Sequence, residues 1–106
     1  MSDVKWSEAE KKLARRVFEA ALVAELAEVI ADFKARAAAV VAADDMWEIE
    51  ERLRNKRQEI DRKYDYRYSQ LIFVFGRLLR EGRVQEAQLA GLAEEKLDGI
   101  RRIASF

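Results

Sequence analysis

Carboxylates and basic side chains are the groups of this sequence that could do chemistry. Closely spaced acids occur at Glu50/Glu51 and at Asp61/Asp65, a pattern that acid/base or metal chemistry could use. Neighbours at i,i+1 do not face each other on a helix, however, and charged helix surfaces are ordinarily solvated and salt-bridged. The sequence has no histidine and no cysteine, which removes the commonest general base and the thiolate ligands of metal sites. We therefore predict no enzyme, no metal site and no cofactor.

Most residues between 48 and 67 are charged, and acids and bases alternate among them. Phosphate binding would be opposed by the interleaved acids, and the whole chain balances 20 Lys+Arg against 20 Asp+Glu. Nucleic acid is therefore excluded as a partner. The spacing instead predicts i,i+4 ion pairs on a helix surface, at Glu48/Arg52, Glu50/Arg54 and Glu59/Lys63.

The candidates for contact with another protein are Trp47, Arg57 and one of two phenylalanines, Phe73 and Phe75. Trp47 and Arg57 combine a large aromatic ring with a forked cation, as interface anchors do. We expect them to act together through stacking or through a carboxylate, which is Glu51 or one on the other chain of a dimer. The alternative is that Trp47 only fills the base of a hairpin. Phe73 and Phe75 are two residues apart, so on a helix they point to different sides and one of them is expected to be exposed for a partner.

The elements that carry these residues are predicted to be helices. The chain of 106 residues suits one domain, it has no proline, and no glycine precedes Gly76. Ser7-x-x-Glu10 has the form of a capping box, so the first helix should begin near residue 8. Asp44 and Asp45 are N-cap candidates for a second helix. Residues of about 7–70 would then form an antiparallel helical hairpin.

The first helix is apolar over most of its circumference. Its only plainly polar stripe is Glu25, Glu28, Asp32 and Arg36, whereas a helix that packs on one partner needs an apolar face only slightly wider than about 100°. The second helix offers only a thin apolar seam in return. We therefore expect a homodimer that pairs the apolar faces of the first helix.

The last third of the chain is predicted to be a small helical head of about 71–106. Residues 71–79 are apolar on nearly every side and indicate a buried helix, and residues 84–104 indicate one or two short helices. The fold class is therefore all-α, with an elongated hairpin stalk and a small head. Met1–Lys5 contains no leader-like apolar segment and no run approaches a membrane span, so a cytoplasmic protein without membrane insertion is expected.

Four sequence blocks resemble the fluorescence recovery protein family of cyanobacteria, whose partner is the orange carotenoid protein. The blocks are Trp6-Ser7-x-Ala9-Glu10, Asp44-Asp45-Met46-Trp47, Lys56-Arg57-Gln58-Glu59-Ile60-Asp61-x-Lys63-Tyr64-Asp65-x-Arg67, and Ile72-Phe73-Val74-Phe75 with Leu78-Leu79-x-Glu81-Gly82-x-Val84-Gln85. The resemblance covers residues 6 to 106 without a gap.

The resemblance implies an all-helical dimer that binds the C-terminal domain of the photoactivated carotenoid protein. Binding would speed the return from the red to the orange form and so end photoprotective, non-photochemical quenching. The implied partner-binding residues are Trp47, Glu51, Arg57 and Phe73. The implied dimer interface comprises Leu26, Ile30, Phe33, Trp47 and Glu50.

Two positions depart from the family pattern. Glu50 stands where a histidine is expected and Gly99 where a head lysine is expected, so a divergent member, from outside the cyanobacteria, is one reading. Restoring both residues should then raise activity toward a cyanobacterial partner. The alternative function is a dimeric helical interaction or scaffold module with an unknown partner.

Overall fold

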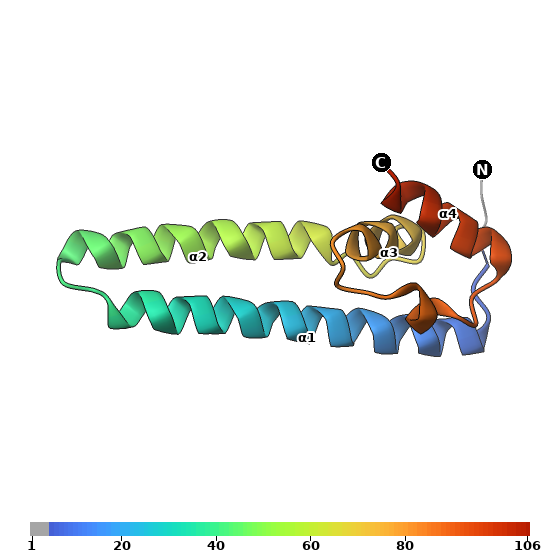
Figure 1. The fold of residues 1–106 in the computed structure, drawn as a ribbon, viewed down its shortest axis with the longest axis horizontal. Coiled ribbons are helices and arrows are strands. Elements are labelled where there is room, and N and C mark those ends of the chain that lie inside the picture. The colour runs from blue at the N-terminus through green and yellow to red at the C-terminus, as the bar shows by residue number, and fades with distance from the viewer. Residues whose placement is uncertain (1–4) are drawn as a thin grey trace. The chain divides into compact units, whose positions relative to one another are not determined.

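The computed structural model describes residues 5–106, and they form helices joined by short connections (Figure 1). The elements are α1 (Glu8–Ala38), α2 (Ala43–Lys63), α3 (Leu71–Arg80), the short 3-10 helix η1 (Glu86–Leu89) and α4 (Glu94–Ala104). Among these described residues the only β-type pairing is an isolated bridge between Ala90 and Leu92. The predicted all-α class is confirmed. The expectation about a leader segment concerns Met1–Lys5, of which residues 1–4 lie outside the described part of the chain.

The chain divides into two compact units. We call residues 22–64 the hairpin unit, and residues 5–21 together with 65–106 the head unit. The sequence placed the boundary of the hairpin at about residues 7 and 70, whereas the structure places the first turns of α1 in the head unit. The reason is burial, because these turns contribute apolar side chains to the head core, at Leu13, Ala14, Val17, Phe18 and Ala21.

The start of α1 is fixed by the expected capping box. The Ser7 hydroxyl accepts a hydrogen bond from the Glu10 backbone N–H at 3.1 Å, and the Glu10 carboxylate accepts one from the Ser7 N–H at 3.0 Å. Two otherwise unpaired backbone donors are satisfied in this way. The helix therefore begins at Glu8, as predicted.

The start of α2 differs from the expectation in one detail. Ala42 occupies the N-cap position, and Asp45 lies in the first turn. The Asp45 carboxylate accepts backbone hydrogen bonds from Ala42 and Val41, both at 3.0 Å, and these bonds hold its pKa below the usual value. Asp45 therefore caps the helix from inside it, because its side chain reaches back over the turn, and neither Asp44 nor Asp45 is the N-cap residue.

The head unit contains the main apolar core. Its largest fully buried side chains come from α3, α4 and the segment between them, at Leu71, Phe75, Leu78, Val84, Leu89 and Ile100. Helix α3 confirms the predicted buried helix, and of the expected one or two short helices after it the structure has two, η1 and α4. Gly91 between them has a φ of 116°, a backbone conformation that favours glycine.

A buried ion pair closes the head unit around the start of α1. The Lys96 ammonium lies 3.0 Å from the Glu10 carboxylate and donates a 2.7 Å hydrogen bond to the Lys5 carbonyl. Burial alone would raise the pKa of Glu10. The backbone N–H groups of Ser7 and Ala93 and the Lys96 ammonium outweigh burial and lower this pKa from 4.5 to about 2.

The head unit should therefore lose stability in acid through Glu10. A carboxylate with a lowered pKa contributes its full stabilisation above pH 4.5, and this contribution is lost as the pH falls from 4.5 toward about 2. Glu10→Gln should cost about 1–3 kcal/mol at pH 7, with a smaller difference from wild type near pH 3. Unfolding followed by circular dichroism across pH measures both values. The exposed Glu8 is the control, and equal losses for Glu8→Gln and Glu10→Gln would contradict the prediction.

Candidate functional site

Two acids of the polar stripe of α1, Glu25 and Asp32, contact α2. Within the hairpin unit, Glu25 binds Lys63 and Asp32 binds Arg52, so acids of α1 meet bases of α2. The sequence had offered i,i+4 pairs within α2 for both bases. Of the three predicted pairs, Glu50 with Arg54 is present at 3.2 Å. Lys63 and Arg52 instead bind across the hairpin.

The most buried of these contacts is a cluster at the end of α2. The Lys63 ammonium lies 2.7 Å from the Glu25 carboxylate, and each side chain is only 2% exposed. The Tyr64 hydroxyl donates a further hydrogen bond of 2.7 Å to the same carboxylate. A buried charge pair of this kind needs such additional hydrogen bonds to offset the loss of hydration. The cluster therefore fixes the register of α2 on residues 22–38 of α1.

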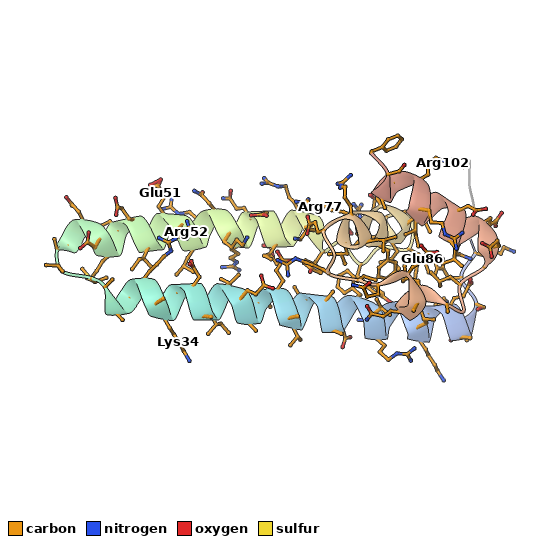
Figure 2. The ribbon with its side chains drawn as sticks, in the orientation of Figure 1. Lys34, Glu51, Arg52, Arg77, Glu86 and Arg102 are labelled. Carbon is orange, nitrogen blue, oxygen red and sulfur yellow. The ribbon has the colours of Figure 1, made fainter. Side chains whose placement is uncertain are left out.

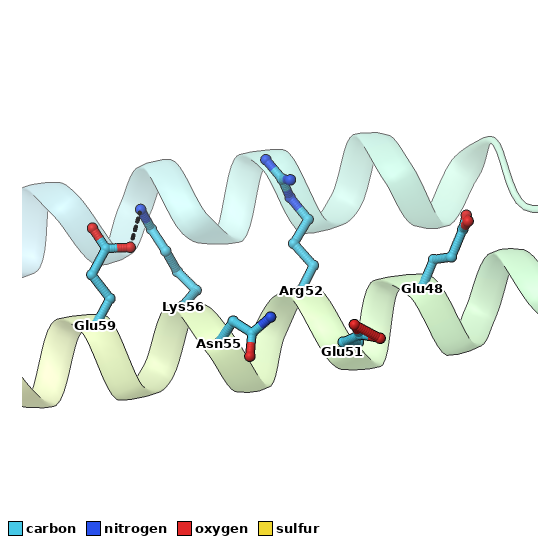
Figure 3. Close-up of a pocket in the computed structure, with 6 residues that line it drawn as sticks. All are labelled: Glu48, Glu51, Arg52, Asn55, Lys56 and Glu59. Atoms are coloured by element: carbon cyan, nitrogen blue, oxygen red, sulfur yellow. Dashed lines mark hydrogen bonds and ion pairs between the residues drawn. The ribbon is translucent and has the colours of Figure 1, made fainter.

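A second ionic contact lies nearer the hairpin turn. The Asp32 carboxylate accepts hydrogen bonds of 3.0 Å from Arg52 and from Arg36, and these bonds hold its pKa below the usual range. Figure 2 shows Arg52 extended between the two helices and Glu51 on the outer side of α2. Both line a groove of about 600 Å³ on α2 (Figure 3), together with Glu48, Asn55, Lys56 and Glu59. Its mixed charge suits ion pairing with a polar protein surface.

Apolar side chains of the hairpin unit point outward. Among residues 22–64, all of which the structure describes, Ile60 is the only apolar side chain that is buried. The exposed apolar side chains are numerous by comparison, at Val23, Leu26, Ile30, Phe33, Val41, Met46 and Trp47. A single chain thus buries charges and exposes apolar groups in this unit, which is the reverse of an ordinary surface helix pair.

An apolar groove of about 420 Å³ lies near the hairpin turn. Its wall is formed by both helices, at Phe33, Ala37, Val40, Met46, Ile49, Glu50 and Leu53. Glu50 is the one charged member, and its carboxylate is held by Arg54. The groove therefore continues the exposed apolar surface of α1 onto α2. The residues predicted for the dimer interface all line this groove or belong to the exposed apolar set.

The structure separates two of the predicted partner-binding residues. Trp47 is 61% exposed at the start of α2, and Arg57 is exposed about 15 Å further along the same helix, from the rise of about 1.5 Å per residue. The Arg57 guanidinium lies 3.9 Å from Asp61. Stacking between Trp47 and Arg57 of one chain is therefore excluded by distance. Trp47 and Glu51, one turn apart, can contact the same partner.

The head unit carries the remaining predicted partner-binding residue. Phe73 is 54% exposed, whereas Phe75 is fully buried, as their spacing predicted. The α3 face that contains Phe75 packs into the core with Leu71, Val74 and Leu78. Phe73 therefore projects from a helix whose rotation is fixed by its own core side chains.

The Glu25, Lys63 and Tyr64 cluster was missed by sequence reasoning. Glu25 was placed in a polar stripe, and Lys63 was paired with Glu59 by spacing. The signal that could have found the cluster is the pair Lys63-Tyr64 at the end of a charged helix. In an antiparallel hairpin this pair lies opposite Glu25, which is one turn from the start of the hairpin unit.

Among residues 5–106, no group of acidic side chains is arranged to hold a metal ion. No helix in that described range is long and apolar enough to cross a membrane.

Comparison with known proteins gives one consistent result. The sequence profile of a family described as "Photoprotection regulator fluorescence recovery protein" matches residues 6–104. The Fluorescence recovery protein of Synechocystis sp. (strain PCC 6803) is 41% identical over 103 residues, which cover 97% of this chain and 94% of that protein.

Solved structures agree with this result along nearly the whole chain. The Fremyella diplosiphon Fluorescence Recovery Protein has a TM-score of 0.90 at 35% identity, and covers 96% of this chain and 100% of its own. The Synechocystis protein has a TM-score of 0.90 at 41% identity with the same coverage. An arginine-to-lysine variant of the Synechocystis protein matches with a TM-score of 0.91.

Proposed function

The chain belongs to the fluorescence recovery protein family, a family of photoprotection regulators, and from this premise we propose that it binds the photoactivated orange carotenoid protein and accelerates its return to the orange form. The proposed contact is with the C-terminal domain of the carotenoid protein, in the cytoplasm. The observation that carries the proposal is the match of residues 6–104 to the family together with the exposed side chains that the structure describes. No bond is made or broken in this role, so it needs neither cofactor nor metal.

Acceleration of this kind is a matter of differential binding. A protein that binds a partly closed carotenoid protein more tightly than the fully open red form lowers the barrier to closure. About 1.4 kcal/mol of barrier reduction gives a tenfold faster recovery. An exposed aromatic anchor such as Phe73 supplies binding energy of this order when it becomes desolvated.

We further propose that the active protein is a homodimer held by its hairpin unit. The supporting observation is the outward apolar surface, which includes Leu26, Ile30 and Phe33 on α1. Trp47 and Glu50 extend this surface onto α2. Burial of such a surface against a second copy removes it from water, and α1 and α2 of one chain leave it uncovered. Arg57 and Glu51 lie outside the apolar groove and are proposed as polar partner contacts.

The proposed function is tested by recovery kinetics. An orange carotenoid protein is converted to its red form by light, and its orange absorption is followed in the dark with and without this protein. We expect recovery to be several-fold faster at an equimolar ratio, and a complex on size exclusion. Unchanged kinetics at a several-fold excess, with no complex, would instead support an interaction module for another partner.

Phe73→Asp should reduce this acceleration strongly. A carboxylate at the exposed tip of α3 must be desolvated on docking, and we expect about tenfold or more weaker acceleration, which corresponds to at least ~1.4 kcal/mol. Dark recovery measured over a titration of the variant gives the loss. Phe106→Asp, at another exposed aromatic of the head unit, is the matched control. Equal effects of the two substitutions would show that Phe73 has no special part in docking.

A further inference from the structure

Helices α3 and α4 make the most extensive helix–helix contact in the described part of the chain. Their contact is made by one glycine and one isoleucine from each helix, four residues apart and therefore on one face. On α3 the order is Ile72 then Gly76, and on α4 it is Gly99 then Ile103. Since Ile72 faces Gly99 and Gly76 faces Ile103, the two helices run in the same direction along the contact.

Each isoleucine lies over the glycine of the other helix. A Cβ added at Gly76 would lie 2.5 Å from both Cβ and Cγ2 of Ile103, a separation that real atoms do not reach. A Cβ added at Gly99 would lie 3.2 Å from Cγ2 of Ile72. The Ile72 side chain cannot swing away easily, because β-branched residues in helices have one strongly preferred χ1 rotamer. We call this pair of contacts the glycine notches.

A further contact holds the end of α4 on α3. Arg80 donates hydrogen bonds to the carbonyls of Ile103 and Phe106, at 3.4 and 3.3 Å. The α3 face toward α4 is thereby fixed at three successive turns, at residues 72, 76 and 80. The core side chains fix a second face of α3. Phe73 lies seven residues before Arg80 and therefore at the edge of the α3 face toward α4, where its side chain is exposed.

From this arrangement we infer that Gly76 and Gly99 are positioning residues for Phe73. The glycine notches set how closely α4 packs on α3, and the position of α4 in turn sets the protein surface beside Phe73 that a partner contacts. The inference rests on the proposed function for the identity of that partner. A glycine inside a helix ordinarily costs stability relative to alanine. Both glycines therefore lower the helix propensity of their helices, and the close approach of α3 and α4 depends on the absence of their side chains.

The first test uses the sign of a stability change. Gly99→Ala should lower Tm by a few degrees, although alanine in a helix normally raises it. In an Ile72→Ala background, which removes the facing Cγ2, the same substitution should raise Tm. Glu95→Ala, at an exposed site of α4, should leave Tm nearly unchanged in both backgrounds. A rise of Tm for Gly99→Ala in both backgrounds would overturn the notch at position 99.

The second test measures the surroundings of position 73 directly. The chain has no cysteine, so Phe73→Cys introduces a single thiol whose reaction rate with a disulfide reagent reports access at that position. We expect Gly99→Ala to change this rate about twofold or more. Val74→Cys, a buried neighbour, should stay protected and so exclude general unfolding. An unchanged thiol reaction rate at position 73, despite a lower Tm, would show that the notches only stabilise the fold and would overturn the inference.

The third test connects the notches to binding. Well below its Tm, Gly99→Ala should weaken the acceleration of carotenoid-protein recovery several-fold, and Ile72→Ala should restore part of it. Undiminished acceleration would overturn the positioning role. A different failure identifies the proposed function as wrong: the unsubstituted protein then leaves recovery unchanged, while the thiol reaction rate of Phe73→Cys still responds to Gly99→Ala.

Discussion

Lys63→Met should destabilise the hairpin unit by about 3–5 kcal/mol, because it leaves the Glu25 carboxylate buried without the Lys63 ammonium. Both partners are nearly inaccessible to water, so water cannot replace the lost ammonium. The hydrogen bond from Tyr64 remains but cannot neutralise the charge. Urea unfolding at a fixed protein concentration measures the loss as a shift of the midpoint, and concentration is held constant because association contributes to apparent stability.

Arg62→Met is the matched control for this prediction. Arg62 precedes Lys63 on α2, is exposed, and loses the same charge in the same type of substitution. Its expected effect is below about 0.5 kcal/mol. The double variant Glu25→Leu/Lys63→Met should recover most of the loss, since the pair is removed as a whole. Equal midpoints for Lys63→Met and Arg62→Met would show that the buried pair carries no special stability.

Ile30→Glu should convert the proposed dimer into a monomer. Ile30 is 53% exposed between Leu26 and Phe33 on α1, so in a dimer its side chain would be buried against the second copy. A two-fold interface contains the substitution twice, and each carboxylate would lose hydration without a cation to pair with. A penalty of about 3 kcal/mol or more raises the dissociation constant by a factor of roughly one hundred or more.

Light scattering across a dilution series measures this change. The wild type should have about twice the chain mass of 12.3 kDa, and Ile30→Glu should approach 12.3 kDa at concentrations of about ten micromolar. Ala31→Glu is the control, because Ala31 is exposed on α1 but lies about 100° around the helix from Ile30. A wild type that is monomeric throughout, or a dimeric Ile30→Glu, would contradict the proposed interface.

Local signals in the sequence were sufficient for much of the fold. The capping box at Ser7 and Glu10 fixed the start of α1, and the spacing of Phe73 and Phe75 indicated that one of the two aromatics would be exposed. Both inferences depend only on residues within one turn of each other. Helix geometry at that range is nearly independent of the rest of the molecule.

Contacts between distant segments could not be predicted in the same way. Glu59 and Glu25 were both acids available to Lys63, and spacing favoured the first, four residues away. The structure selects Glu25, which is 38 residues away, because antiparallel packing of α1 and α2 brings it opposite. The same reasoning explains the boundary of the head unit, since only the fold brings residues 5–21 against residues 65–106.

The glycine notches also change what is expected of the two departures from the family pattern. A lysine at position 99 would add a Cβ 3.2 Å from Ile72 as well as a charge, so its effect on activity includes a packing penalty. Glu50 has no such constraint, since its side chain is exposed and pairs with the surface residue Arg54. Glu50→His alone is therefore the cleaner variant with which to examine the family pattern.

The closure of the head unit has a consequence for how the protein is made. Lys96 and Glu10 form an ion pair across 86 positions of sequence. At synthesis rates of about 5–20 residues per second, Glu10 is added to the growing chain roughly 4–17 seconds before Lys96. Residues 22–64 are complete much earlier and can form their hairpin first. During this interval the nascent chain exposes both the outward apolar surface of the hairpin and the uncovered core residues of α1, so this is the stage at which chaperones would have most to bind.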